Sequence, residues 1–183
     1  MALNKILFRL EVSETDRARA YWAAKPWATG ELRDQIGSAD LVIVPWEGFR
    51  EDKPALFPEC ASDVIRTLSA ELADSKVVVA IDRDKYEEIA LYANEWRLPT
   101  VVCTVVIFPL LTGVLANHID RWTMGLSSDA TVEIEVIVEG ERGRCFSLKY
   151  KGPPNKLIDN LSDQVKQCFE PAHPAQTSKK PRR

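Results

Sequence analysis

Histidine and paired cysteine are scarce in this chain of 183 residues. Its two histidines are His118 and His173, and none of its four cysteines belongs to a CxxC pair. The zinc spacings are therefore absent, and a chain this long with so few cysteines is untypical of a disulfide framework. We expect no metal site and no cofactor, and we expect Cys103, which lies in an apolar run, to pack as a small hydrophobic side chain.

The sequence also lacks the short motifs that mark common catalytic sites. It contains no GxGxxG, no Walker GxxxxGK[ST], no HExxH and no GxSxG. A histidine-based hydrolytic triad would have to use His118, which is more typical of a residue at a helix terminus. The N-terminus has neither an uninterrupted apolar core nor a small-residue cleavage site, so we expect a cytoplasmic protein.

The charge of the chain is unevenly distributed. The formal net charge is −3, yet the last thirteen residues carry four basic side chains and no acidic one. Removing these four positive charges leaves the body of the protein at about −7. An acidic body argues against broad coverage of nucleic-acid phosphates, so nucleic acid is not an expected partner. Residues 170–183 are predicted to be a disordered basic tail.

Short apolar strands alternate with amphipathic helices in the first half of the chain. Strand segments are rich in β-branched residues, and the helical segments repeat apolar residues at helical spacing. The predicted strands are Lys5–Val12, Leu41–Val44 and Lys76–Ile81. The predicted helices are residues 13–24, 29–36, 62–73 and 83–96. This order predicts an α/β fold with an open, mostly parallel sheet and helices on both faces.

Residues 98–119 form the longest apolar stretch, and its first nineteen residues carry no charge. Its first part is dense in Val and Ile, and Pro109 is well placed for the first turn of a helix. A buried strand followed by a helix, or a Pro-kinked buried helix, would fit. The alternative is a membrane anchor over residues 98–117, since the run only just reaches the length of a span. Arg97 and Arg121 flank the run symmetrically and give no positive-inside bias.

The C-terminal part predicts an antiparallel hairpin followed by a helix. In "TVEIEVIVE", residues 131–139, Val and Ile alternate with Glu, and Gly140 and Gly143 bracket the turn to "CFSLKYKG". Residues 155–169 form an amphipathic helix. We predict a single α/β domain over residues 1–169, which could subdivide at 97/98, with the hairpin extending the sheet or forming a small second layer.

Polar residues follow two of the predicted strands. Ligands of open α/β sheets bind at the carboxyl ends of strands, so Glu47, Asp52 and Asp82 are candidates to line one crevice. A helix N-terminus near Ser62 could hold an anion. The ligand-binding candidates are Trp46, Glu47, Asp52, Ser62, Asp63 and Asp82. Each candidate also has a purely structural explanation. The acidic residues could be solvated strand ends, Ser62 and Asp63 could cap the next helix, and Trp46 could pack on the core.

The middle of the chain resembles the nucleoside deoxyribosyltransferases. The matching residues are Ala39–Ile43, which read "ADLVI", the long charged loop of residues 45–60, and Glu59 just before the next helix. The resemblance implies Glu59 as nucleophile or base, Asp82 or Glu47 assisting, and a nucleotide-type ligand. The glycine-rich N-terminal motif of that family and the aspartate-glycine before its glutamate are missing here.

Residues 98–169 are similar in pattern to small accessory components encoded beside effectors in bacterial conflict systems. The similarity consists of "LP", the apolar run, the hairpin and "KGPP". It implies that this chain has no catalytic residues of its own and associates with another subunit. Our leading hypothesis is a non-catalytic α/β binding component that associates with a partner protein or with itself in a bacterial, defence-related complex. The alternatives are a nucleoside- or nucleotide-processing enzyme and a membrane-anchored effector.

Overall fold

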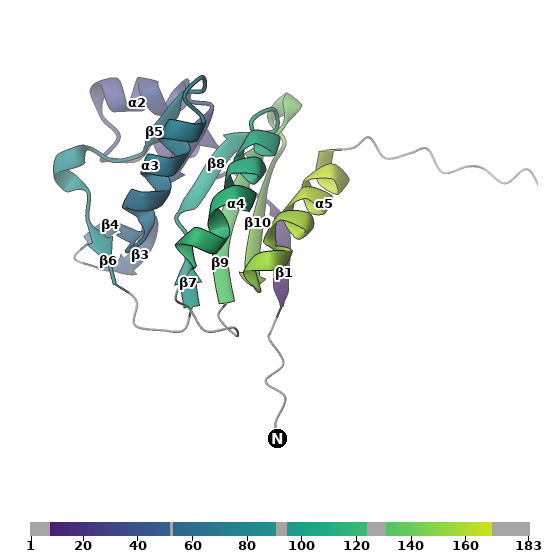
Figure 1. Ribbon diagram of the computed structural model, residues 1–183. Coiled ribbons are helices and arrows are strands. Elements are labelled where there is room, and N and C mark those ends of the chain that lie inside the picture. The colour runs from purple at the N-terminus through teal and green to yellow at the C-terminus, as the bar shows by residue number, and fades with distance from the viewer. Residues whose placement is uncertain (1–7, 52, 91–94, 124–130, 170–183) are drawn as a thin grey trace, which may run out of the picture.

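A seven-stranded sheet forms the centre of the protein (Figure 1). The computed structural model describes residues 8–51, 53–90, 95–123 and 131–169. In spatial order the strands are β1 (Arg9–Glu14), β10 (Cys145–Gly152), β9 (Thr131–Glu139), β8 (Thr100–Thr104), β2 (Leu41–Val44) and β5 (Val77–Val79), and β7 (Glu95–Arg97) pairs with the start of β9. The predicted tail and Asp52 lie outside the described residues.

The sheet is mixed, so the expectation of a mostly parallel sheet was wrong. β2 runs parallel to β5, and β8 and β7 run parallel to β9. β2 and β8 are antiparallel, as are β9 and β10 and also β10 and β1. The reason is that the C-terminal hairpin joins the sheet directly beside β8. A hairpin is necessarily antiparallel, and β1 continues the antiparallel half.

Five α-helices accompany the sheet in the part of the chain that the structure describes. They are α1 (Arg19–Ala23), α2 (Gly30–Gly37), α3 (Ala61–Glu71), α4 (Phe108–Trp122) and α5 (Leu157–Phe169). The predicted helices at 29–36, 62–73 and 155–169 are confirmed within a few residues, with a 3-10 turn at Pro154–Lys156 before α5. Ser62 does not cap α3, because it lies inside the helix and the cap position is Cys60.

Three predicted segments differ from the structure. The predicted helix at residues 13–24 is confirmed only over α1, Arg19–Ala23, because β1 continues to Glu14, which pairs with Phe146 of β10. The loop of residues 45–60 is instead a hairpin, β3 (Trp46–Arg50) and β4 (Lys53–Pro58). Over its described residues, 83–90 and 95–96, the predicted helix 83–96 is replaced by a 3-10 turn at Arg83–Lys85, then β6 (Glu88–Ile89) and the start of β7. Tertiary contacts override helix propensity there: Tyr86 stacks on Phe57, with ring centroids 4.8 Å apart, and β6 pairs with β4.

Alternating residues of the same strands enter two hydrophobic clusters. Leu41 and Ile43 of β2 pack with apolar side chains of α3, α4 and α5, which lie on the viewer's side of the sheet in Figure 1. Val42 and Val44 pack with Trp22 and with side chains of α2. The first cluster includes residues from both sides of position 97/98. The period of two along a strand explains why β2 serves both clusters.

The long apolar stretch is a buried strand followed by a helix, as the sequence indicated. β8 is almost fully buried between β9 and β2, and α4 buries Leu111, Leu115 and Ile119 against the core. Val106 and Leu110 remain exposed at the start of the helix. Among the described residues, no helix combines the length and the apolar character needed to cross a membrane. The proposed anchor over residues 98–117 is therefore not seen as a spanning helix.

Candidate functional site

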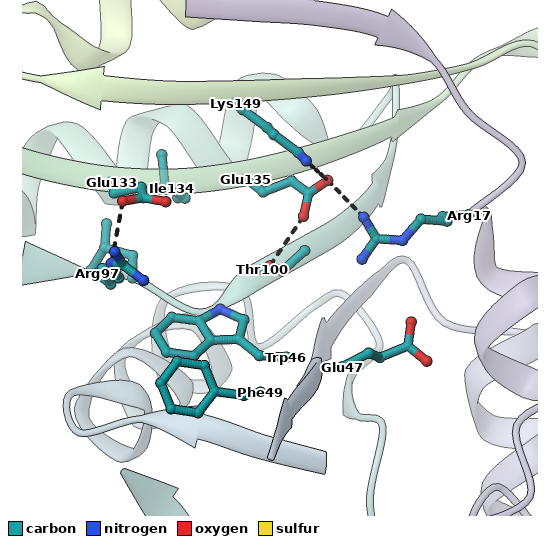
Figure 2. A pocket seen from close by; sticks show the side chains of 11 residues that line it. Arg17, Trp46, Glu47, Phe49, Arg97, Thr100, Glu133, Ile134, Glu135 and Lys149 are labelled. Atoms are coloured by element: carbon teal, nitrogen blue, oxygen red, sulfur yellow. Dashed lines mark hydrogen bonds and ion pairs between the residues drawn. The ribbon is translucent and has the colours of Figure 1, made fainter. Parts of the chain in front are cut away.

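A cavity of about 440 Å³ lies between the polar side of the sheet and the β3–β4 hairpin. Figure 2 shows its lining: strands β8, β9 and β10 carry Thr100, Glu133, Glu135 and Lys149, and β3 carries Trp46 on the opposite wall. We call this cavity the charged groove. Its full lining is Arg17, Trp46, Glu47, Phe49, Arg97, Leu98, Thr100, Glu133, Ile134, Glu135 and Lys149.

Glu135 is the most heavily contacted carboxylate of the groove. The Arg17 guanidinium donates to it at 2.8 Å and the hydroxyl of Ser147 at 2.7 Å. Thr100 Oγ1 lies 3.5 Å away and the Lys149 ammonium 4.0 Å away (Figure 2). The Glu135 side chain is only 14% exposed. Charged hydrogen bonds of this kind hold a partly buried carboxylate in place, so Glu135 fixes the floor of the groove.

Glu133 anchors a second cluster two residues along β9. It is contacted by Arg97 at 3.2 Å and by Lys151 at 3.8 Å. The strand register explains both clusters, because Lys151 is the direct neighbour of Glu133 and Lys149 is the direct neighbour of Glu135. Opposite charges placed across adjacent strands attract one another and stabilise the register.

Two aromatic side chains form the opposite wall. The rings of Trp46 and Phe49 lie 6.0 Å apart, and the Arg97 guanidinium is 5.9 Å from the Trp46 ring. Phe49 is 42% exposed, which is unusual for so large an apolar side chain. Gly48 between them has a φ of +68°, which a glycine adopts without strain, and the β3–β4 register shifts at this point. This bulge places both rings beside the groove.

Glu47 closes the end of the groove next to α1. It forms an ion pair with Lys25 and accepts a hydrogen bond of 2.8 Å from the Tyr21 hydroxyl. The Lys25 ammonium also lies 3.8 Å from the centre of the Tyr21 ring, with Trp22 and Trp27 within 6 Å. Burial lowers the pKa of Lys25, but hydrogen bonds to Glu47 and Tyr21 outweigh it, and the pKa is raised. The ion pair of Lys25 with Glu47 thus links the residues just after α1 to β3.

The structure separates Glu47 from Asp82, which the sequence placed in one crevice. Trp46 and Glu47 line the charged groove, whereas Ser62 and Asp82 line another cavity of about 770 Å³ along the edge strand β5. Glu59 is exposed between β4 and α3 and lines neither cavity. Asp63 is exposed and paired with Arg66.

Five charged groove residues were not among the candidates. They are Arg17, Arg97, Glu133, Glu135 and Lys149. The alternation in "TVEIEVIVE" did indicate that the glutamates of β9 share one side, and the same period places the lysines of "FSLKYKG" on one side of β10. Pairing these two patterns across the hairpin would have predicted the clusters. Arg17 and Arg97 carry no such signal, because they come from other parts of the chain.

The buried cysteines are not suited to act as nucleophiles, and the described residues hold no group of metal-ligating side chains. Burial raises the pKa of Cys60 to about 12 and that of Cys145 to about 11, and it also raises the pKa of Cys103. Such thiols stay protonated and are poor nucleophiles. Within residues 8–51, 53–90, 95–123 and 131–169, no three His, Cys, Asp or Glu side chains are grouped as metal ligands.

The charged groove is therefore a preformed site with paired charges and an aromatic wall. Such an arrangement can orient a polar or peptide-like ligand by hydrogen bonds while one apolar group packs on the rings. Comparisons with protein-family models, with curated proteins and with solved structures find no match for this chain.

Proposed function

We propose that this chain is a non-catalytic binding protein that holds a segment of a partner polypeptide in the charged groove. The observation that carries the proposal is the pairing of an aromatic wall, made by the half-buried Trp46 and the exposed Phe49, with a floor of fixed charges around Glu135. Aromatic and arginine side chains are enriched where protein partners bind tightly. The groove has both types, and they come from three separate parts of the chain: Arg17 before α1, Trp46 and Phe49 in β3, and Arg97 in β7.

The state of the groove carboxylates supports binding rather than catalysis. Glu47, Glu133 and Glu135 each form an ion pair with a lysine or an arginine of the chain itself. A general acid or base needs a proton-accepting atom that is directed toward the substrate. Here the lone pairs are directed toward structural partners, so these carboxylates are suited to fixing geometry.

The arrangement of the helices also favours this surface. We take α3, α4 and α5 to cover one face of the sheet, and α1 and α2 to cover the β2–β5 part of the other face. Under this arrangement the polar side of β1, β9 and β10 stays open to a partner. A bacterial, defence-related setting and a cytoplasmic location remain predictions from the sequence.

No observation favours the nucleoside-processing alternative. It requires Glu59 to work with Glu47 or Asp82, and these three residues do not line one cavity among those described above. That alternative remains a prediction, which turnover assays with NAD and a panel of nucleosides would test. Turnover by the unchanged protein that disappears in Glu59→Gln would contradict the binding proposal and support the enzyme alternative.

Photo-crosslinking at two positions tests the binding proposal. A benzophenone amino acid replaces Phe49 at the groove in one full-length variant and Leu110 at the exposed start of α4 in another. We expect a discrete protein adduct from position 49, and its loss when Trp46→Ala is added. Size-exclusion chromatography with light scattering then gives the mass of the complex. An adduct only from position 110, or a strictly monomeric protein without adducts, would contradict the proposal.

A further inference from the structure

The sheet surface that continues from the charged groove has a net positive charge in an acidic protein. We call it the charged sheet face and define it by eight ionisable residues, which are the charged side chains of two adjacent rows of the sheet together with Arg17: Arg9, Glu11, Arg17, Arg97, Glu133, Glu135, Lys149 and Lys151. Five of these side chains are basic and three are acidic, whereas the whole chain has a net charge of −3. The sign of this surface is therefore opposite to that of the molecule.

Strand register arranges these residues in two rows across the sheet. One row runs from Arg9 of β1 through Lys151 of β10 and Glu133 of β9 to Arg97 of β7. The second row runs from Glu11 through Lys149 to Glu135. Side chains in one row point to the same side of the sheet. The rows extend the groove floor to the edge strand β1.

The acidic groups of this surface already have close arginine partners. Glu135 is 2.8 Å from Arg17, Glu133 is 3.2 Å from Arg97, and Glu11 is bonded to Arg9. Lys149 shares Glu135 with Arg17, at the longer distance of 4.0 Å, and its side chain is 56% exposed. Its ammonium group can therefore turn toward a ligand without leaving a carboxylate uncompensated.

We infer that the partner segment bound in the charged groove is acidic and carries one aromatic or large apolar side chain. This inference rests on the proposed function. Lys149 and its basic neighbours would face the carboxylates of the segment, and Trp46 and Phe49 would face its apolar side chain. Charge complementarity of this kind selects the partner and speeds association. A basic segment would instead be attracted to the acidic remainder of the protein.

The same surface is less suited to nucleic acid. The carboxylates of Glu11, Glu133 and Glu135 lie among the basic groups of both rows, and a phosphate backbone would be repelled by each of them. A polypeptide can place polar or small residues opposite these positions. A peptide therefore matches this mixed charge pattern better than a chain that carries a charge at every unit.

Fluorescence anisotropy with short labelled peptides tests the inference. The probes are an acidic peptide containing one tryptophan, the same peptide with alanine in place of the tryptophan, a version with lysine in place of every acid, and a single-stranded RNA. We expect the acidic tryptophan peptide to bind most tightly, to bind more weakly at higher salt, and to lose about tenfold in affinity in Lys149→Glu. Lys149→Gln should show a smaller loss, which guards against misfolding in the reversed-charge variant.

Lys156→Glu is the matched control, because Lys156 is exposed in the turn before α5 and outside the groove lining. Binding equal to the unchanged protein is expected there. Tighter binding of the lysine peptide would contradict the inference that the partner segment is acidic. The absence of binding by any peptide, while the crosslink at position 49 persists, would contradict it too. Both outcomes would leave the proposed function standing. Preferential binding of RNA, or loss of the crosslink as well, would overturn both.

Discussion

The Arg17 guanidinium lies 2.8 Å from the carboxylate of Glu135, a residue 118 positions further along the chain. Arg17 also lies 5.2 Å from the centre of the Trp22 ring, which belongs to the second hydrophobic cluster. One side chain thus joins the segment before α1 to strand β9. The charged groove is consequently formed only when the sheet has closed and α1 has docked.

Removing the charge of Glu135 should destabilise the fold. In Glu135→Gln we expect a loss of about 2 kcal/mol in the free energy of unfolding, since hydrogen bonds to charged groups contribute about 1.5–3 kcal/mol and Arg17 would lose its partner. Urea unfolding followed by circular dichroism measures the loss. Glu11→Gln, at an exposed pair with Arg9, is the control and should cost under about 1 kcal/mol. Equal losses would contradict the anchoring role of Glu135.

Lys25 and Glu47 should be coupled in stability. We expect Lys25→Met and Glu47→Gln each to destabilise the protein, and the double variant to lose less than the sum of the two. The expected coupling is about 1–2 kcal/mol, because both side chains are partly buried and are hydrogen-bonded together with Tyr21. A double-mutant cycle in urea measures it. Additive losses would show that the ion pair of Lys25 and Glu47 contributes no coupling energy to stability.

Stability should decline as the pH rises above 9 because of Cys60. Its thiol is buried and donates to the Arg97 carbonyl at 3.2 Å, and burial raises its pKa from 9.0 to about 12. The unfolded chain therefore releases this proton first, so the native state loses stability between pH 9 and pH 12. The slope is up to about 1.4 kcal/mol per pH unit. Urea unfolding at pH values below and above 9 should show a shallower decline in Cys60→Ala, and identical slopes would contradict the assignment.

Two glycines should respond to alanine in opposite ways. A Cβ at Gly140 would overlap the ring of Phe169, which packs edge-on against Phe146. We expect Gly140→Ala to cost about 1–2 kcal/mol by displacing that ring. Gly113 lies exposed inside α4 with nothing within 4 Å, so Gly113→Ala should stabilise by about 0.5–1 kcal/mol. Thermal unfolding compares them, and two shifts of the same sign would contradict this account.

Segments with a strong local pattern were predicted well. Leu41–Val44 is a run of four buried apolar residues and forms β2 with the predicted bounds. The alternation in residues 131–139 gives β9, and the helical repeat in residues 155–169 gives α5. Segments with a weak pattern were predicted wrongly. Residues 45–60 read as a loop because of their prolines and charges, yet Trp46 and Glu47 pair with Leu56 and Ala55.

The candidate site was predicted only in part, and the reason is geometric. Trp46 and Glu47 were selected because they follow β2, and both line the charged groove. Asp82 follows β5 in the same way, but it lines the other cavity, beside Ser62. The fact that a residue follows a strand therefore did not predict which of the two cavities its side chain would line. A search based on strand ends also could not find Lys149, which lies in the middle of β10.

The amino-acid sequence by itself determined the alternation of buried and polar residues within each strand and helix, because that alternation depends on the periods of two and 3.6 residues. It also limited residues 98–119 to a strand followed by a helix, a Pro-kinked buried helix or a membrane anchor, and the structure shows the first of these. Only the tertiary structure decided that β9 lies between β8 and β10, and that Arg17 reaches Glu135. Strand order and long-range ion pairs depend on which surfaces meet after the chain has collapsed, and no local pattern encodes that choice.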